Sequence, residues 1–157
     1  MGLIVTREAF AALRDSLPDK TRIVFTNGCF DLLHVGHILL MNYARSLGDA
    51  LVVGLNSDSS VRQLKGPRRP LVPQEERAAV MAALPSVDFV IIFDETLPIE
   101  TVRAVRPAIH VKGGDYDAEQ MPETPVVRAL GGEVVIVPLV EGHSTTNLLE
   151  RIGRIAE

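Results

Sequence analysis

The chain has 157 residues, which is the size of one domain, and 46% of them are hydrophobic, enough to bury a core. Its formal net charge of −4 provides no overall basic field, which argues against nucleic acid and anionic membrane as partners. The single cysteine excludes an intramolecular disulfide, and there is neither a membrane-length apolar stretch nor the layout of a signal peptide. We therefore expect a single cytoplasmic domain over residues 1–157.

Taken in chain order, β-branched runs alternate with segments of helical character. The expected strands are mostly continuous apolar runs, as in strands covered on both faces, at 22–27, 50–55, 87–93, 108–112 and 133–137. The expected helices lie before, between and after them, at 6–17, 35–47, 74–83, 96–105, 119–130 and 145–156. This alternation predicts an α/β fold, a Rossmann-like three-layer sandwich with a five-stranded parallel sheet and extra N- and C-terminal helices.

A glycine turn with two histidines joins the strand at 22–27 to the helix at 35–47. It reads Asn27-Gly28-Cys29-Phe30-Asp31-Leu32-Leu33-His34-Val35-Gly36-His37. Backbone N–H groups without intrahelical partners and the positive end of the helix dipole make such a turn receptive to phosphate. His34 and His37 lie one turn apart and can donate hydrogen bonds to the same ligand, while Gly36 permits close approach of the backbone.

Two other interpretations of the histidines are weaker. If the histidines only capped the helix or packed against it, neither the glycine turn nor the preceding strand would be needed. A zinc pair lacks a third ligand at metal-like spacing nearby. The combination therefore predicts a phosphate site.

Polar residues that follow the other strands are expected to join this site, because ligands of open α/β sheets bind beyond the carboxyl ends of the strands. Lys112 offers a cation directly after its strand, which favours an anion ligand over a plain turn. The hydroxyls that open the last helix would cap it and could also hold a triphosphate. The segments concerned are Asn56-Ser57-Asp58, Lys112-Gly113-Gly114-Asp115 and Ser144-Thr145-Thr146.

Three further features allow more than one interpretation. Lys65, Arg68 and Arg69 stand on a proline-rich loop, where anion binding is slightly favoured over a solvated charge run. Cys29 is most simply a small buried residue, because no base beside it would make it a nucleophile. Asp31 either shapes the turn by bonding backbone N–H groups or touches a metal.

Residues Gly28 to His37 resemble the signature of the HxGH nucleotidyltransferases. The resemblance implies attack of a phosphate or similar nucleophile on the α-phosphate of a nucleoside triphosphate, with pyrophosphate leaving. We expect an in-line associative displacement without a covalent enzyme intermediate. A non-catalytic nucleotide sensor on the same fold remains an alternative, and an RNA-binding role lacks a basic face.

A larger set of motifs is similar to the adenylyltransferases of ADP-heptose biosynthesis and covers residues 22–152. These motifs are Thr26-Asn27-Gly28-Cys29-Phe30-Asp31, Val53-Gly54-Leu55-Asn56-Ser57-Asp58, Leu64-Lys65-Gly66 with Arg69-Pro70, Glu76-Arg77, Val111-Lys112-Gly113-Gly114-Asp115-Tyr116 and Ser144-Thr145-Thr146-Asn147. The resemblance implies transfer of AMP from ATP to D-glycero-β-D-manno-heptose 1-phosphate. Many members carry a fused sugar kinase domain, for which this chain is too short, so the stand-alone form is expected.

The main competitor is glycerol-3-phosphate cytidylyltransferase, which shares the strand, turn and helix. Its arginine and threonine before the last helix correspond here to Leu139 and Val140, and its lysine to Leu149, which shifts the expected base toward adenine. The chain also departs from the heptose pattern, with Glu150 where lysine is common and His143 where a small or sulfur-bearing residue is usual. Another sugar phosphate is therefore an alternative acceptor.

The resemblance also implies roles for individual residues. The expected catalytic residues are His34, His37 and Lys112. Residues expected to bind ATP are Asn27, Gly28, Cys29, Phe30, Gly36, Asn56, Asp58, Gly113, Gly114, Asp115, Ser144, Thr145 and Thr146. Residues expected to bind the sugar phosphate are Asp31, Lys65, Arg69 and Arg77. Mg²⁺ is expected, mainly on phosphate oxygens and water, and a homodimer is expected.

Overall fold

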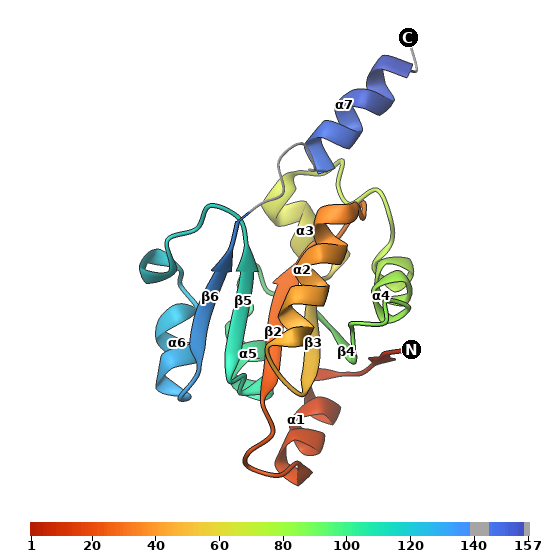
Figure 1. Cartoon of the computed structure of the whole chain (residues 1–157). Helices are drawn as coiled ribbons and strands as arrows, with labels where there is room; N and C mark the ends of the chain where they lie inside the picture. Colours follow the sequence, from red (N-terminus) through yellow and green to blue (C-terminus); the bar gives the residue numbers. More distant parts are fainter. Residues whose placement is uncertain (139–144, 156–157) are drawn as a thin grey trace.

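The computed structural model describes residues 1–138 and 145–155, and within them six strands form one parallel sheet. The strands lie in the order β1-β4-β3-β2-β5-β6, which places β2 near the middle (Figure 1). Their bounds are β1 (Leu3–Ile4), β2 (Ile23–Gly28), β3 (Ala50–Asn56), β4 (Phe89–Phe93), β5 (Ile109–Gly113) and β6 (Glu133–Val137). The parallel α/β sheet predicted from the sequence is confirmed.

The predicted number of five strands is wrong by one edge strand. β1 has only two residues, both exposed, and it pairs with β4 through Leu3↔Phe89 and Ile4↔Val90. A strand of two residues shows no measurable periodicity in the sequence, so β1 is recognised only by its pairing with β4.

Helices occupy the connections between the strands. The described helices are α1 (Arg7–Ser16), α2 (Val35–Ser46), α3 (Asp58–Lys65), α4 (Gln74–Ala82), α5 (Ile99–Val105), the 3₁₀ turn η1 (Ala118–Gln120), α6 (Thr124–Ala129) and α7 (Thr145–Ile155). The sequence analysis missed α3, whose start is capped by the Ser57 hydroxyl accepting from the Ser60 N–H. The single helix expected over 119–130 is divided into η1 and α6, because Pro122 cannot continue a helix.

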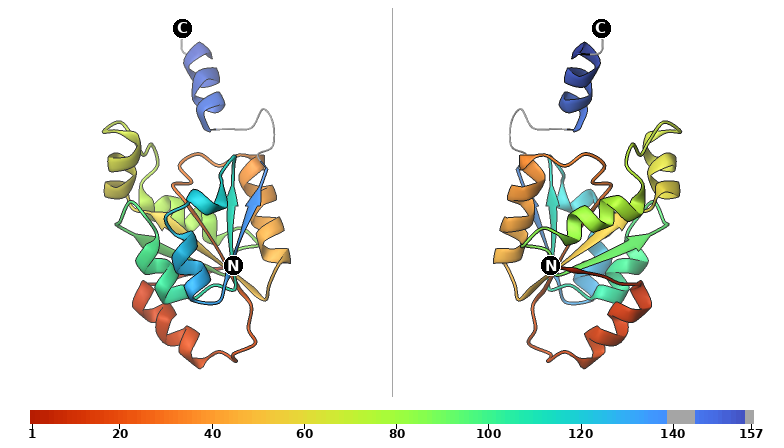
Figure 2. Two further views of the ribbon diagram at one scale, coloured as in Figure 1. Left: turned by 90° about the vertical axis from the view of Figure 1, so that its left-hand side faces the viewer. Right: turned by 90° about the vertical axis from the view of Figure 1, so that its right-hand side faces the viewer.

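Helices cover both faces of the sheet, which gives the predicted three layers (Figure 2). Met41 of α2 and Met81 of α4 belong to the buried cluster on one face. Phe10 of α1, Val102 of α5 and Val127 of α6 belong to the cluster on the other. Among the described helices, none is long and apolar enough to cross a membrane.

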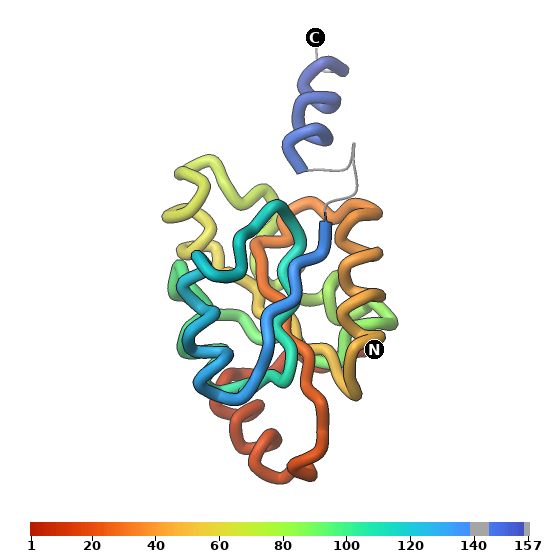
Figure 3. Tube along the Cα trace, turned by 60° about the vertical axis from the view of Figure 1, so that its left-hand side comes forward, coloured from red at the N-terminus to blue at the C-terminus, as the bar shows by residue number. Residues whose placement is uncertain are grey.

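The two terminal helices lie at opposite ends of the molecule, as the trace in Figure 3 shows. α1 lies near the amino ends of the central strands, whereas α7 projects beyond their carboxyl ends (Figure 1). The hydroxyl of Thr145, the first residue of α7, donates to the Leu32 carbonyl oxygen over 3.4 Å. This contact brings the start of α7 to the turn that follows β2.

Candidate active site

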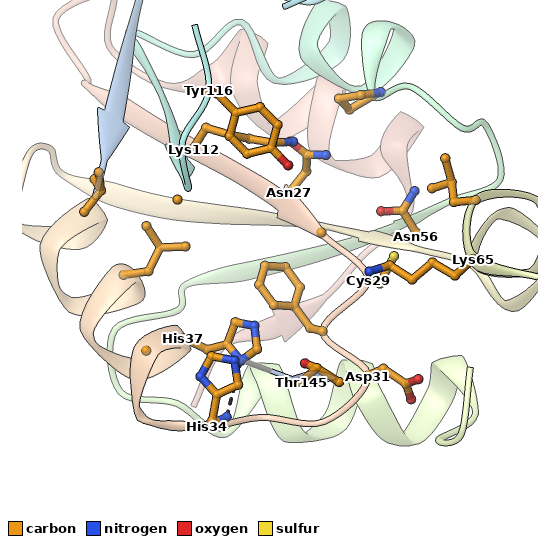
Figure 4. Close-up of a pocket in the computed structure, with 18 of the residues that line it drawn as sticks. Asn27, Cys29, Asp31, His34, His37, Asn56, Lys65, Lys112, Tyr116 and Thr145 are labelled. Carbon is orange, nitrogen blue, oxygen red and sulfur yellow. Dashed lines mark hydrogen bonds between the residues drawn. The ribbon is translucent and has the colours of Figure 1, made fainter. Parts of the chain in front are cut away.

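A cleft of about 820 Å³ lies at the carboxyl ends of the strands, within the size range typical of small-molecule sites. Figure 4 shows its labelled residues, with Lys112, Asn27 and Tyr116 across the cleft from His34 and His37. The predicted site residues that line it are Asn27, Gly28, Cys29, Phe30, Asp31, His34, Gly36, His37, Asn56, Lys65, Arg69, Lys112, Gly113, Thr145 and Thr146. The structure thus brings together residues that the sequence places on five different connections.

The two histidines stand at the beginning of α2, where His34 is the N-cap residue. Their rings stack with centroids 3.8 Å apart, and the His34 backbone N–H donates to His37 Nδ1 over 3.3 Å. Burial, together with His34, lowers the pKa of His37 to about 4. The His37 ring is therefore neutral at pH 7, and because Nδ1 accepts, its proton sits on Nε2 as a donor.

Phe30 supports this arrangement from the turn. Its backbone φ of 44° lies in the left-handed region, which non-glycine residues seldom adopt. The residue is 7% exposed, and its ring packs edge-on against His37 with centroids 5.4 Å apart. The strained turn thus buries an aromatic ring beneath the histidine.

Lys112 lies across the cleft and is held by three groups. Its Nζ donates to Asn27 Oδ1 over 3.2 Å, lies 3.6 Å from Glu123 Oε1, and stands 5.5 Å from the centre of the Tyr116 ring. Burial lowers the pKa of Lys112, and the negative charge of Glu123 opposes this effect. Lys112 is thus a cation fixed at the cleft wall.

Asp31 connects the turn to the loop over residues 65–73. It accepts from the backbone N–H groups of Leu71 and Val72, both at 2.9 Å, and from Arg69 Nε at 2.7 Å. Burial alone would raise the pKa of Asp31, but these N–H donors outweigh it and hold the pKa below its usual value. The sequence left two roles open for Asp31, bonding of backbone N–H groups or contact with a metal. The contacts agree with the first role, although the N–H groups belong to the loop over residues 65–73 and not to the turn after β2.

Arg77 and Asp58 form an internal brace rather than a part of the cleft lining. Arg77 is 2% exposed, and its guanidinium donates to the carbonyl oxygens of Cys29, Asn56 and Val72. It also pairs with Asp58 Oδ1 at 2.7 Å. The brace therefore joins the ends of β2 and β3 to the loop before α4.

Four further predicted residues need separate description. Gly114 is buried and Asp115 is exposed, and neither lines the cleft. Ser144, like His143, lies outside the described residues. Cys29 lines the cleft half-buried, and burial raises the pKa of its thiol. A thiol that stays protonated at neutral pH is a poor nucleophile.

Several cleft residues were not predicted as site residues. They are Tyr116 and Glu123 near Lys112, Leu39, Leu40 and Tyr43 on α2, Leu64 on α3, the run Thr96–Pro98 before α5, and Val137 and Pro138 at the end of β6. Tyr116 was in a recognised motif, so the signal for it was present. In residues 1–138 and 145–155 no group of three or more His, Cys, Asp or Glu side chains could hold a metal ion.

The parallel sheet, its helical layers and a helix N-terminus with two histidines at the strand ends define a Rossmann-like α/β nucleotide-binding class. The sequence model of the family described as Cytidylyltransferase-like matches residues 25–150. The chain belongs to the cytidylyltransferase-like family, in agreement with the nucleotidyltransferase class expected from the sequence.

Similar curated proteins carry the name Bifunctional protein HldE. The protein from Syntrophotalea carbinolica is 53% identical over 145 residues, which are 90% of this chain and 30% of the relative. Those from Pelobacter propionicus and Koribacter versatilis are 54% and 58% identical over 95% and 83% of this chain, and 31% and 27% of their own lengths. The chain thus spans less than a third of the length of the curated relatives it matches.

Two solved structures are also similar. The lipopolysaccharide core biosynthesis protein from Thermoplasma volcanium superposes with a TM-score of 0.63 at 31% identity, covering 78% of this chain and 99% of that one. A pantoate-beta-alanine ligase from Francisella tularensis, solved with β-γ ATP and β-alanine, gives 0.61 at 15% identity, covering 99% of this chain and 78% of that one. The second likeness concerns the fold alone.

Proposed function

We propose that the protein transfers AMP from ATP to D-glycero-β-D-manno-heptose 1-phosphate, giving ADP-heptose and pyrophosphate. The observation that carries the proposal is the pair of stacked histidines, 3.8 Å apart, facing Lys112 across one cleft. The resemblance over residues 22–152, the relatives named HldE and the lipopolysaccharide core protein support this acceptor.

The donor groups suit an in-line displacement at the α-phosphorus. The neutral His37 ring would donate from Nε2 to a phosphoryl oxygen, and Lys112 would balance the charge that grows on the equatorial oxygens. A sugar 1-phosphate is already ionised, so its attack needs no general base. The raised pKa of Cys29 supports direct transfer without a covalent enzyme intermediate.

The anionic ends of the two substrates need further cations and hydroxyls. Thr145 and Thr146 at the start of α7 suit the β- and γ-phosphates of ATP. Lys65, which is exposed, and Arg69, which is paired with Asp31, suit the sugar phosphate or the leaving pyrophosphate. The cleft thus offers separate anion contacts to two substrates.

A divalent cation, Mg²⁺ in our proposal, would accompany ATP. The described residues offer no cluster of metal ligands, and Asp31 is already engaged by Arg69, Leu71 and Val72. This donor set fits an ion held mainly by phosphate oxygens and water, whose role would be to offset phosphate charge.

We also propose a homodimer. α7 carries the apolar residues Leu148, Leu149, Ile152 and Ile155 and projects from the body, with the last two 55% and 85% exposed. Light scattering on the full chain tests this assembly, and a monomer at high micromolar concentration would contradict it.

Pyrophosphate release tests the proposed reaction. Each of the four nucleoside triphosphates is combined with heptose 1-phosphate, glycerol 3-phosphate and other sugar 1-phosphates. We expect turnover with ATP and heptose 1-phosphate. Turnover only with CTP would instead indicate a cytidylyltransferase, and ATP binding without pyrophosphate release would indicate a sensor.

A further inference from the structure

His110 is a buried polar residue next to the cleft that has no role in the proposal above. It lies on β5 opposite Phe25 of β2, its side chain is 0% exposed, and the two rings have centroids 5.2 Å apart. Alternate residues of a strand share one face, so Lys112 points to the same side of β5 as His110. Asn27 follows Phe25 on the matching side of β2.

Two donors meet at one oxygen of Asn27. Lys112 Nζ lies 3.2 Å and His110 Nε2 lies 3.1 Å from Asn27 Oδ1. An ammonium can only donate, so the atom that faces Lys112 must be the amide oxygen rather than the nitrogen. His110 Nε2 meets the same oxygen and must therefore carry a proton.

The other atoms of this group agree with that assignment. Among the described residues His110 Nδ1 is buried without a hydrogen-bond partner, as expected for the bare nitrogen of a neutral ring. Burial, followed by the charge of Lys112, lowers the pKa of His110 to about 3, which keeps the ring neutral. With Oδ1 occupied twice, the Nδ2 group of Asn27 makes no hydrogen bond within the described residues, although Asn27 lines the cleft.

We propose that His110 is a positioning residue that fixes the Asn27 amide, so that Oδ1 holds Lys112 and Nδ2 donates to an anionic phosphate oxygen in the cleft. Without the Nε2 donor only Lys112 holds Oδ1, so the amide is fixed less firmly and more often turns Oδ1 toward the bound anion, which it repels. His110 thus acts on the substrate only through Asn27 and Lys112. The choice of a nucleotide phosphate as the anion rests on the proposed function.

The test compares two replacements of His110. His110→Phe fills the space without a donor, and His110→Gln can supply an N–H near the position of Nε2. We expect His110→Phe to lower kcat/KM about fivefold to tenfold, the typical worth of one hydrogen bond, and His110→Gln to restore most of it. Thr101→Val, which removes a fully buried polar group at another position, the hydroxyl on α5, is the matched control and should retain wild-type kinetics.

A double-mutant cycle separates positioning from a general loss of packing. If His110 acts through Asn27, His110→Phe causes no further loss in an Asn27→Ala background. Losses that multiply in the double variant would overturn the proposal, as would a His110→Phe enzyme with wild-type kinetics.

Two measurements do not depend on turnover. In ¹⁵N-histidine NMR spectra of the wild-type protein, His110 should show a protonated Nε2 and a bare Nδ1 near pH 7, and the opposite tautomer would overturn the proposal even if the variants fail to fold. Calorimetry should show about fivefold weaker ATP binding by His110→Phe. If the wild type binds ATP without transferring it, the proposed function fails, while these two readouts still decide the role of His110.

Discussion

The backbone N–H of His34 donates to Nδ1 of His37 over 3.3 Å, so the first residue of the HxGH pattern sets the tautomer of the second. The two residues between them, Val35 and Gly36, place the histidines one helical turn apart, which allows the rings to stack. His37 therefore presents an N–H at Nε2 without carrying a positive charge at pH 7. His37 thus offers a preorganised donor rather than a second cation beside Lys112.

Removal of the His37 ring should affect turnover far more than folding. We expect His37→Ala to lower kcat by about 10²- to 10³-fold, on the scale of losing one oxyanion-hole donor. The measurement is pyrophosphate release at saturating ATP and acceptor. His37→Gln keeps an amide donor and should lose less, and near-normal kcat in His37→Ala would contradict the proposed mechanism.

The protein should lose stability at mildly acidic pH, above the pH at which most carboxylates titrate. Burial lowers the pKa of His37 to about 4 and that of His110 to about 3, whereas an unfolded histidine titrates near 6.5. Between these values the unfolded chain binds more protons, so the free energy of unfolding falls as the pH drops below about 6.5. Urea unfolding midpoints at pH 7.5, 6 and 5 measure this.

His110→Phe provides the control for this pH dependence. It removes one of the two titrating rings, so its midpoint should change less between pH 7.5 and 5 than that of the wild type. A wild-type midpoint that rises on acidification would exclude both depressed pKa values.

Arg77→Ala should destabilise the fold strongly. It leaves three carbonyl oxygens and the Asp58 carboxylate without their guanidinium partner in a buried region. We expect the free energy of unfolding to drop by about 3–5 kcal/mol in urea titrations, as when one partner of a buried ion pair is removed. Arg62→Ala, an exposed arginine on α3, should change it by less than about 0.5 kcal/mol.

The contacts of these residues explain which parts of the site could be predicted from the sequence. The histidine pair and Lys112 were predictable because a strand, a glycine turn and a helix start constrain where such side chains lie. Arg77 carried the same motif signal, yet sequence cannot distinguish an arginine that binds substrate from one that satisfies carbonyl oxygens 48 and 21 residues away. Its placement depends on how the loop before α4 packs.

The surroundings of Lys112 show the same limit at closer range. Glu123 comes from the start of α6, after a segment that proline divides, so its approach to Lys112 depends on a helix boundary that periodicity misplaced. In the sequence, His110 was only a polar residue between two apolar residues of a strand, Ile109 and Val111. Its contact with Asn27 follows from the pairing of β5 with β2, which strand order determines and local sequence does not.

A side chain at Gly114 should disturb the cleft through Tyr116. The backbone φ of Gly114 is 138°, and a Cβ there would lie 2.7 Å from the Tyr116 ring, which packs near Lys112. Gly131 has a φ of 83°, and a Cβ at that position would meet no atom within 4 Å, so it offers backbone strain without the clash. We expect Gly131→Ala to cost about 1 kcal/mol of stability with unchanged kinetics. Gly114→Ala should in addition raise KM for ATP severalfold, because the tyrosine must move away from the lysine. Equal KM values in the two variants would show that Tyr116 has no part in binding.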